Sequence, residues 1–389
     1  MARRAADTAL TPDVPVIAKL VAIVASHAPS LINFRGPLLA ELRARGNRVL
    51  AIAPDFDAAT TARLEALRID RREIALARTG LDPIADWRSV RQLTALFAET
   101  KPDVVTGYTP KAAIYSAIAG RSAGVPAVVP MVTGLGYAFL QQRSLKIFAV
   151  RQATKALYAR AFKASDAVIF QNEDDLATLR GLGLLPEGLP AHIVAGSGVD
   201  LDAFPACPLP SLEGGIDFLM IARLVRYKGV FEFCEAARAL RARGAQARFR
   251  LIGGVESGPA AFKPAEIARF GDAVEYLGPR TDIAAQIAAA HIYVLPSYGE
   301  GMPRTVLEAL AVGRPVITTD VAGCRSTVLP GVNGTLVPPR DAEALRQAME
   351  GFLKRPDRIA PMAAASRRRA EAVYDVRLVT AATIAALGL

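Results

Sequence analysis

The sequence predicts an α/β protein made of two doubly wound domains, each a parallel sheet covered by helices on both faces. Short segments rich in Val, Ile and Ala alternate with amphipathic segments, and this alternation starts again after a Gly- and Pro-rich stretch at 196–215. The length of 389 residues also exceeds one core of ordinary size and suits two.

Seven strands are expected in the first half, because each segment is short, apolar and bounded by turn residues. They are 19–26, 48–54, 72–76, 102–108, 125–132, 166–171 and 191–196. Helical patterns such as Leu31 to Arg45 and Trp87 to Glu99 separate them. Strands joined through helices pair in parallel, so residues 1–195 are expected to form the first domain.

Six more strands are expected in the second domain, which we place at 196–372. They are 216–223, 247–254, 273–278, 291–297, 314–320 and 333–339. The stretch 196–215, GSGVDLDAFPACPLPSLEGG, has the composition of a hinge between the two domains.

Composition excludes a disordered chain, since 52% of the residues are hydrophobic and 22% are charged. Cys207, Cys234 and Cys324 match no metal-ligand spacing and are too few for a disulfide framework, which favours a reducing cytosol. Residues 1–15 carry acidic side chains and lack the apolar core of a signal peptide, so a short disordered lead is expected.

Residues 122–142 form an uncharged run of about the length that a bilayer span needs. Pro126, Pro130, Gly134 and Gly136 interrupt it, so we interpret its first part as a buried strand. Any membrane contact is then expected to be peripheral.

Positive charge is concentrated in the first half of a chain whose formal net charge is +10. No acidic residue falls between Asp103 and Asp166, whereas eight basic ones do: Lys111, Arg121, Arg143, Lys146, Arg151, Lys155, Arg160 and Lys163. Such a stretch suits a phosphate-rich surface, either anionic lipid or nucleic acid, or is a plain solvated helix face. Sparse aromatic residues and the lack of a nucleic-acid motif argue against nucleic acid.

Ligands of open parallel sheets bind beyond the carboxyl ends of the strands, so the loops there supply candidate contacts. In the first domain, SHAPS contains His27, GYTPK contains Tyr108 and Lys111, and TGLGYAF contains Thr133 and Gly134. The second domain has five strand-end loops that supply candidate contacts: ARLVRYKG, GGVESG, LGPRTD, SYGEGMP and TDVAGCR. Two such half-sites facing each other across a hinge form a cleft for two substrates.

No resident cofactor or metal is expected. The glycine pairs that begin at Gly134, Gly181 and Gly196 lack the third glycine of a dinucleotide fingerprint, and no Walker loop occurs. The D-x-D triplets at 55–57 and 200–202 are interpreted as a turn and a helix cap.

Phosphate chemistry is favoured by ARLVRYKG, which ends a strand and opens a helix with Arg223 and Lys228 on either side of Arg226. A guanidinium and an ammonium can hold a diphosphate and neutralise the charge that grows on it as a leaving group.

Two glutamates lie eight residues apart in SYGEGMPRTVLEAL. On one helix Glu300 and Glu308 would be about 12 Å and about 80° apart, so we expect Glu300 in the preceding loop and Glu308 in the second turn. Gly301 permits close backbone approach, and Pro303 suits the first helical turn, whose free N–H groups favour an anion.

The hinge GSGVDLDAF, the motif ARLVRYKG and the motif EGMPRTVLE follow one another in this order along the chain. Together they resemble the family 4 glycosyltransferases, which are retaining enzymes of the GT-B fold. The resemblance covers essentially the whole chain and implies that the final segment, 373–389, crosses back onto the first domain. It also implies a metal-independent enzyme whose donor is a nucleotide sugar, UDP-linked in our interpretation.

The resemblance implies roles for individual residues. Glu300 would contact hydroxyls of the donor sugar beside the N–H groups of Gly301 and Met302, with Pro303 following. Glu308 would hold the ribose, and Arg223 and Lys228 the diphosphate. The backbone from Gly278 to Arg280 would hold the base.

The stretches SHAPSLINFRGPLL, GYTPKAAIYSAIAG and TGLGYAF look like bacterial members that extend undecaprenyl-diphosphate-linked oligosaccharides for surface polysaccharides. This implies a lipid-linked acceptor on the first domain, near Tyr108, Lys111, Thr133 and Gly134. It also implies peripheral attachment to the inner face of the plasma membrane. Many relatives carry a histidine in the loop at 106–108, and this chain does not. His27, which follows the first strand at the cleft, is the candidate histidine for substrate contact and catalysis.

Two alternatives remain open at this stage. A GT-B sugar-nucleotide epimerase would share the diphosphate site but would need an acid/base pair at the sugar. A non-catalytic, two-lobed binding protein would need export.

Overall fold

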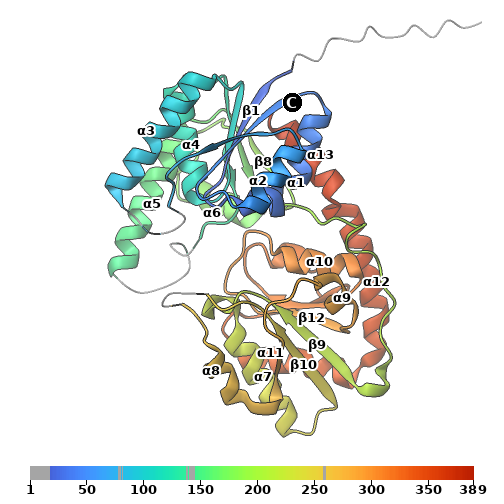
Figure 1. Ribbon diagram of the computed structural model, residues 1–389. Helices are drawn as coiled ribbons and strands as arrows, with labels where there is room; N and C mark the ends of the chain where they lie inside the picture. Colours follow the sequence, from blue (N-terminus) through green and yellow to red (C-terminus); the bar gives the residue numbers. More distant parts are fainter. Residues whose placement is uncertain (1–17, 78–79, 81, 137–138, 140–144, 257–259) are drawn as a thin grey trace, which may run out of the picture.

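The computed structural model describes residues 18–77, 80, 82–136, 139, 145–256 and 260–389, with only the backbone of 145–147. The expected lead at 1–15 and Arg143 lie outside the described residues, as does the side chain of Lys146. The chain folds into two α/β domains, one above the other in Figure 1, with the carboxyl-terminal helices running along one side of both.

The first domain holds two parallel sheets, ordered β3-β2-β1-β4-β5 and β6-β7-β8. Its strands are β1 (Leu20–Val24), β2 (Arg48–Ala53), β3 (Asp70–Glu73), β4 (Val104–Gly107), β5 (Ala127–Val128), β6 (Met131–Val132), β7 (Val168–Phe170) and β8 (Ala191–Ile193). Its helices are α1 (Pro29–Ala44), α2 (Ala58–Ala66), α3 (Pro83–Thr100), α4 (Pro110–Ser122), α5 (Leu145–Lys163) and α6 (Glu173–Gly181).

One expected strand is divided. Residues 125–132 form β5 and β6 on either side of Pro130, which has no N–H to donate to a ladder. β5 pairs with β4, whereas β6 pairs with β7. The two sheets remain joined, because Asp166 donates its N–H to the Val128 carbonyl at 2.9 Å.

The second domain has one parallel sheet of order β11-β10-β9-β12-β13-β14. Its strands are β9 (Ile216–Ile221), β10 (Ala247–Ile252), β11 (Glu275–Tyr276), β12 (Ile292–Leu295), β13 (Val316–Thr319) and β14 (Gly334–Val337). Its helices are α7 (Val230–Ala242), α8 (Pro264–Ile267), α9 (Ile283–Ala288), α10 (Arg304–Val312), α11 (Ala342–Lys354) and α12 (Ile359–Arg369). Short 3₁₀ turns include η3 (Arg226–Lys228).

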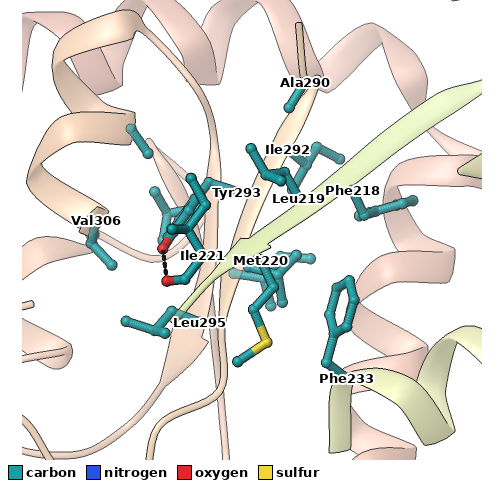
Figure 2. Close-up of a cluster of buried hydrophobic side chains, with 14 of the residues drawn as sticks. Phe218, Leu219, Met220, Ile221, Phe233, Ala290, Ile292, Tyr293, Leu295 and Val306 are labelled. Atoms are coloured by element: carbon teal, nitrogen blue, oxygen red, sulfur yellow. Dashed lines mark hydrogen bonds between the residues drawn. The ribbon is translucent and has the colours of Figure 1, made fainter. Parts of the chain in front are cut away.

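The core of the second domain fixes the strand ends that carry its loops. Figure 2 shows part of this apolar cluster, including Phe218, Phe233 and Ile292. Within it, the buried Tyr293 of β12 donates its hydroxyl to the Ile221 carbonyl at the end of β9, at 3.0 Å. This bond ties together the two central strands.

Two chain segments cross between the domains side by side. Val199 donates its N–H to the Tyr374 carbonyl at 2.8 Å, and Val376 donates to the Val199 carbonyl at 3.0 Å. Beyond this crossing, α13 (Val376–Ala386) packs against α1, and Ile384 joins the core of the first domain.

The linker between the domains is anchored over part of its length. Arg314, fully buried, donates to the carbonyls of Cys207 and Pro208, both at 2.9 Å, and to that of Ala288 at 2.7 Å. The expected hinge at 196–215 is therefore held to the second domain from Cys207 onward.

Candidate active site

The second-domain loops that carry most candidate residues follow β9 and β12. The strand order of the sheet reverses between these two strands. Crevices at such a reversal are the usual ligand sites of doubly wound sheets.

Lys228 and Glu300 form the central ion pair of this region. The Lys228 ammonium donates to Glu300 Oε1, and the Ser297 hydroxyl donates to the same oxygen at 2.7 Å. The two charged side chains are only 16% and 12% exposed, so water screens their attraction weakly. The structure thus brings together a cation and a carboxylate that are 72 positions apart in sequence.

Gly229 is the residue that lets these loops meet. It lies between η3 and α7 with φ +76°, and a Cβ atom there would collide with the Pro296 carbonyl. Only glycine combines this backbone conformation with so close an approach.

Arg223 lies on the same loop as Lys228 but points elsewhere. Its guanidinium donates to Glu256 Oε1 at 3.3 Å and to the Tyr227 hydroxyl at 3.1 Å, and its side chain is 44% exposed. Arg226 pairs with Glu266 at 2.6 Å. Arg223 therefore has an acidic partner outside the Lys228–Glu300 pair.

Glu308 is buried in the second turn of α10, where Arg304 Nε donates to its Oε1 at 2.9 Å. Burial raises the pKa of Glu308, and the charge of Arg304 partly opposes that rise. Arg304 also donates to the Asn33 carbonyl, so it links α10 to α1 of the first domain.

The two glutamates occupy different elements, but both influence the buried Tyr293 through their charge. Glu300 lies in the loop before α10 and Glu308 within the helix. Burial raises the pKa of Tyr293 most, and the charges of both glutamates raise it further. Both carboxylates thus act electrostatically on Tyr293, which ties β9 to β12.

Thr133 and Gly134 bring the first domain directly against the Glu300 loop. A Cβ atom on Gly301 would collide with the Thr133 carbonyl, and one on Gly134 would lie 3.1 Å from the Gly301 Cα. Gly134 has φ +121°, which favours glycine on backbone grounds as well. Close contact between the domains here requires both glycines.

Asn172 also contacts this loop and was not among the residues expected from the sequence. Its side-chain amide donates to the Gly301 carbonyl at 2.8 Å from the residue before α6. The rule that singled out the other strand-end loops applies equally to the loop after β7, because Asn172 stands two positions beyond Phe170.

Two residues expected on the acceptor side are buried in the first domain. The Tyr108 hydroxyl bonds to the Ser30 hydroxyl at 2.8 Å, and burial raises the pKa of Tyr108 to about 12. Lys111 pairs with Asp86 at 2.6 Å, with both side chains at most 13% exposed. Their polar atoms are thus engaged inside this domain.

His27 is exposed just after β1, on the rim of the same sheet edge. The Thr60 N–H lowers the pKa of Asp57 most, and the nearby His27 contributes a smaller lowering. Asp57 itself caps α2 by accepting the Thr60 N–H at 2.6 Å.

The remaining donor-side candidates lie in the loop after β11, the edge strand of the sheet, and in the Glu300 loop itself. Gly278 accepts the Gly253 N–H at 3.0 Å, and Arg280 is paired with Asp282 at 2.9 Å. Pro303 is the residue immediately before α10, and Met302 packs on the hinge, where a Cβ on Gly196 would overlap its side chain.

The described part of the chain contains no cluster of three or more His, Cys, Asp or Glu side chains placed to hold a metal ion. Nor does any helix in that part combine the length and apolarity needed to cross a membrane.

Two family models match the chain, one on each domain. The model described as "Glycosyl transferase 4-like domain" matches residues 35–194, and the model described as "Glycosyl transferases group 1" matches residues 215–355. The first match begins after His27 and contains Thr133, Gly134 and Asn172, and the second contains Lys228 and Glu300.

The chain is similar to two curated bacterial enzymes. One is the N,N'-diacetylbacillosaminyl-diphospho-undecaprenol alpha-1,3-N-acetylgalactosaminyltransferase of Campylobacter jejuni, 29% identical over 85% of this chain and 88% of that protein. The other is the UDP-Gal:alpha-D-GlcNAc-diphosphoundecaprenol alpha-1,3-galactosyltransferase of Escherichia coli, 29% identical over 68% and 70%.

Solved structures share the fold over nearly the whole chain. Sucrose-phosphate synthase from Thermosynechococcus elongatus superposes with a TM-score of 0.74 at 21% identity, covering 94% of this chain and 98% of that one. Anabaena HepE in complex with UDP and glucose also gives 0.74, at 18% identity, covering 95% and 99%.

Proposed function

The chain belongs to the two-domain glycosyltransferases of the GT-B fold, with the 4-like and group 1 models matching its first and second domains, and from this we propose its reaction. It transfers a hexose or N-acetylhexosamine from a UDP-sugar to a polyprenyl-diphosphate-linked saccharide. The product would be an intermediate of a bacterial surface polysaccharide or glycan. Two similar bacterial enzymes that are named for diphospho-undecaprenol-linked sugars support this choice.

The observation that carries the proposal is the Lys228–Glu300 ion pair at the reversal point of the second sheet. It sets a cation for a phosphate and a carboxylate for sugar hydroxyls side by side. Thr133 and Gly134 of the first domain meet the same loop at Gly301.

We propose that the second domain holds the donor through charge and helix-start N–H groups. Lys228, joined by Arg223 once it leaves Glu256, neutralises the diphosphate as it departs. The start of α10, which has no side-chain cap, offers N–H groups to the same anion. Glu308 accepts hydrogen bonds from the ribose through Oε2, while its Oε1 accepts from Arg304.

We propose that transfer retains the configuration of the sugar. The acceptor hydroxyl attacks from the face that the diphosphate leaves, and a departing phosphate oxygen takes its proton. Glu300 orients the donor hydroxyls and forms no covalent bond. The charge on the leaving group is assigned to Arg223 and Lys228, so this reaction scheme requires no metal.

We also propose peripheral attachment to the inner face of the plasma membrane. Of the basic residues expected to face it, Lys111 pairs with Asp86 and Arg121 with Asp166, so they are neutralised within the domain. The basic side chains of α5 are the better candidates, with Arg160 and Lys163 exposed and Phe148 58% exposed on the same helix. Exposed cations suit an anionic surface, and an exposed aromatic side chain on the same helix suits the headgroup boundary.

The experiment that tests the function combines the purified chain, a panel of UDP-sugars and a polyprenyl-diphosphate-linked saccharide, with NMR of the product. The proposal expects UDP and a lengthened saccharide whose new linkage keeps the anomeric configuration of the donor. Formation of an epimeric UDP-sugar, or binding without UDP release, would contradict it.

A further inference from the structure

Asn172 is almost fully buried, at 2% exposure, and both polar atoms of its side chain form hydrogen bonds. Its Oδ1 accepts the Asp175 N–H at 2.8 Å and so caps α6. Its Nδ2 donates to Asp175 Oδ2 at 2.9 Å and to the Gly301 carbonyl of the other domain at 2.8 Å. The first two bonds fix the amide, and the third is made across the cleft.

We propose that Asn172 is a positioning residue that holds the Glu300 loop in its working conformation when the domains are together. This rests on the proposed function, because it assigns Asn172 a role in sugar transfer. Asn172 acts on the loop through the Gly301 backbone carbonyl.

The bond acts on the peptide that follows Gly301. In a trans peptide the carbonyl and the next N–H point in opposite directions. Pulling the Gly301 carbonyl toward Asn172 therefore turns the Met302 N–H away from the first domain. The same pull restrains the backbone beside Glu300, whose side chain faces Lys228 and Ser297.

Asparagine suits this position better than the other common helix caps. Serine and aspartate can accept the N–H at the start of a helix, but only an amide also supplies two donors. One donor is held by the buried Asp175 and the other by Gly301.

A neighbouring contact between the domains is weaker. Arg325 pairs with Asp174 at 2.9 Å, but the side chains are 46% and 39% exposed. Exposed pairs contribute little and are screened by salt. Asn172 thus makes the buried polar link from the start of α6 to the second domain.

The test uses the full chain with Asn172→Ser, which keeps a capping oxygen but cannot reach Gly301. The control is Asp82→Ser, a cap change at α3 of the first domain, where Asp82 accepts the N–H groups of Ile84 and Ala85, both at 3.1 Å. Four quantities are measured: kcat for transfer, Kd for UDP, Tm, and the radius of gyration with UDP from small-angle X-ray scattering.

We expect Asn172→Ser to lower kcat by about tenfold or more, since small misplacements of reacting groups are costly. The Kd for UDP should match that of Asp82→Ser, and the radius of gyration should increase. The Tm should fall by a few degrees more than in Asp82→Ser, because the buried Asp175 carboxylate loses the Asn172 donor. A kcat within twofold of wild type with an unchanged radius would overturn the proposal. Equal losses in UDP affinity and kcat would do the same, because they indicate general damage to the donor site.

Failure of the proposed function gives a different result from failure of the role of Asn172. If the wild-type chain transfers no sugar, the scattering comparison still decides whether Asn172 holds the domains together. An increased radius in Asn172→Ser then supports the contact, and an unchanged radius refutes it.

Discussion

At the scale of single residues, the site is prepared before any ligand arrives. Lys228 donates to Glu300, and Ser297 donates to the same carboxylate, so both charged side chains are already fixed in place. Charges fixed in advance in a partly dry site stabilise a developing anion more than mobile ones do. Arg223 differs, because it is 44% exposed and pairs with Glu256 at 3.3 Å.

Lys228→Met should weaken UDP binding by about tenfold or more, because it removes a charge-assisted bond to phosphate. Arg226→Met is the matched control, since Arg226 loses the same charge from the same loop but is 53% exposed and paired with Glu266. Isothermal titration with UDP measures both, and the control should stay within about twofold. Equal losses in the two variants would contradict a specific role for Lys228.

At the scale of elements, α6 shows how the fold places a polar contact in a buried position. Asn172 begins the helix, and Asp175 follows in its first turn at 4% exposure. Burial raises the pKa of Asp175 to about 6, which the amide of Asn172 opposes. Between pH 3.8 and about pH 6, Asp175 therefore holds a proton in the folded protein that it has released in the unfolded chain.

This predicts a pH effect on stability with a definite sign. The pKa of Asp175 is raised from 3.8 to about 6, so its contribution is most favourable below pH 4 and declines as the pH rises to about 6. Two pKa units correspond to about 3 kcal/mol.

Asp175→Asn removes that proton and keeps an oxygen that can accept from Asn172. Its Tm relative to wild type should therefore be several degrees higher at pH 7.5 than at pH 4.5, by about 6 °C if the full effect is expressed. Asp341→Asn, which removes a capping carboxylate of α11, is the reference variant, and the pH-dependent difference of Asp175→Asn should exceed the difference that it shows. A difference that is the same at both pH values would refute the assignment.

Much of the element order follows from local pattern, and the exceptions have physical causes. The expected strand at 216–223 is β9 (Ile216–Ile221), and the expected helix from Leu31 is α1 (Pro29–Ala44). Residues 125–132 were expected as one strand, but Pro130 breaks the ladder there.

The site is less predictable than the fold because its contacts join distant positions. The residue types of Glu300, Lys228 and Gly301 could be singled out from strand-end loops. That Lys111 is neutralised by Asp86, 25 positions earlier, could not, since pairing across helices leaves no local pattern. The contact of Asn172 with Gly301 spans 129 positions and is equally hidden.

At the scale of the whole molecule, two domains are held together by paired chain crossings and by contacts at the cleft. Val199 and Val376 lie together at the crossing, and α13 returns to α1. At the cleft, Gly301 meets Thr133 and Gly134. Contacts at both places suit a cleft that closes about a hinge during the reaction.

Gly301→Ala tests this closure. Gly301 does not have a positive φ, so alanine fits the loop backbone, but its Cβ would collide with the Thr133 carbonyl when the domains meet. Transfer should fall by about 100-fold while UDP binding to the second domain stays within about twofold. Gly351→Ala, in α11 with open space around it, is the control and should be neutral or slightly stabilising. Full activity of Gly301→Ala would contradict the observed closeness of the domains.

Membrane attachment is tested by flotation with liposomes. The chain should float with vesicles that contain anionic lipid and less with neutral vesicles, and added salt should release it. Charge reversal of Arg160 and Lys163 to Glu on α5 should abolish the preference, whereas reversal of Arg355 and Arg358, near the start of α12, should leave it unchanged. Flotation that ignores lipid charge would refute the attachment surface.

The central claim is that the Lys228–Glu300 pair serves sugar transfer, and acceptor-dependent UDP release tests it most directly. In the wild-type chain, a polyprenyl-diphosphate-linked saccharide should accelerate UDP release from the donor. In Glu300→Gln, which keeps the shape but leaves Lys228 without its carboxylate, that accelerated rate should fall by about 100-fold or more with little change in Tm. Acceptor-stimulated release at the wild-type rate in Glu300→Gln, or none in the wild type, would contradict the claim.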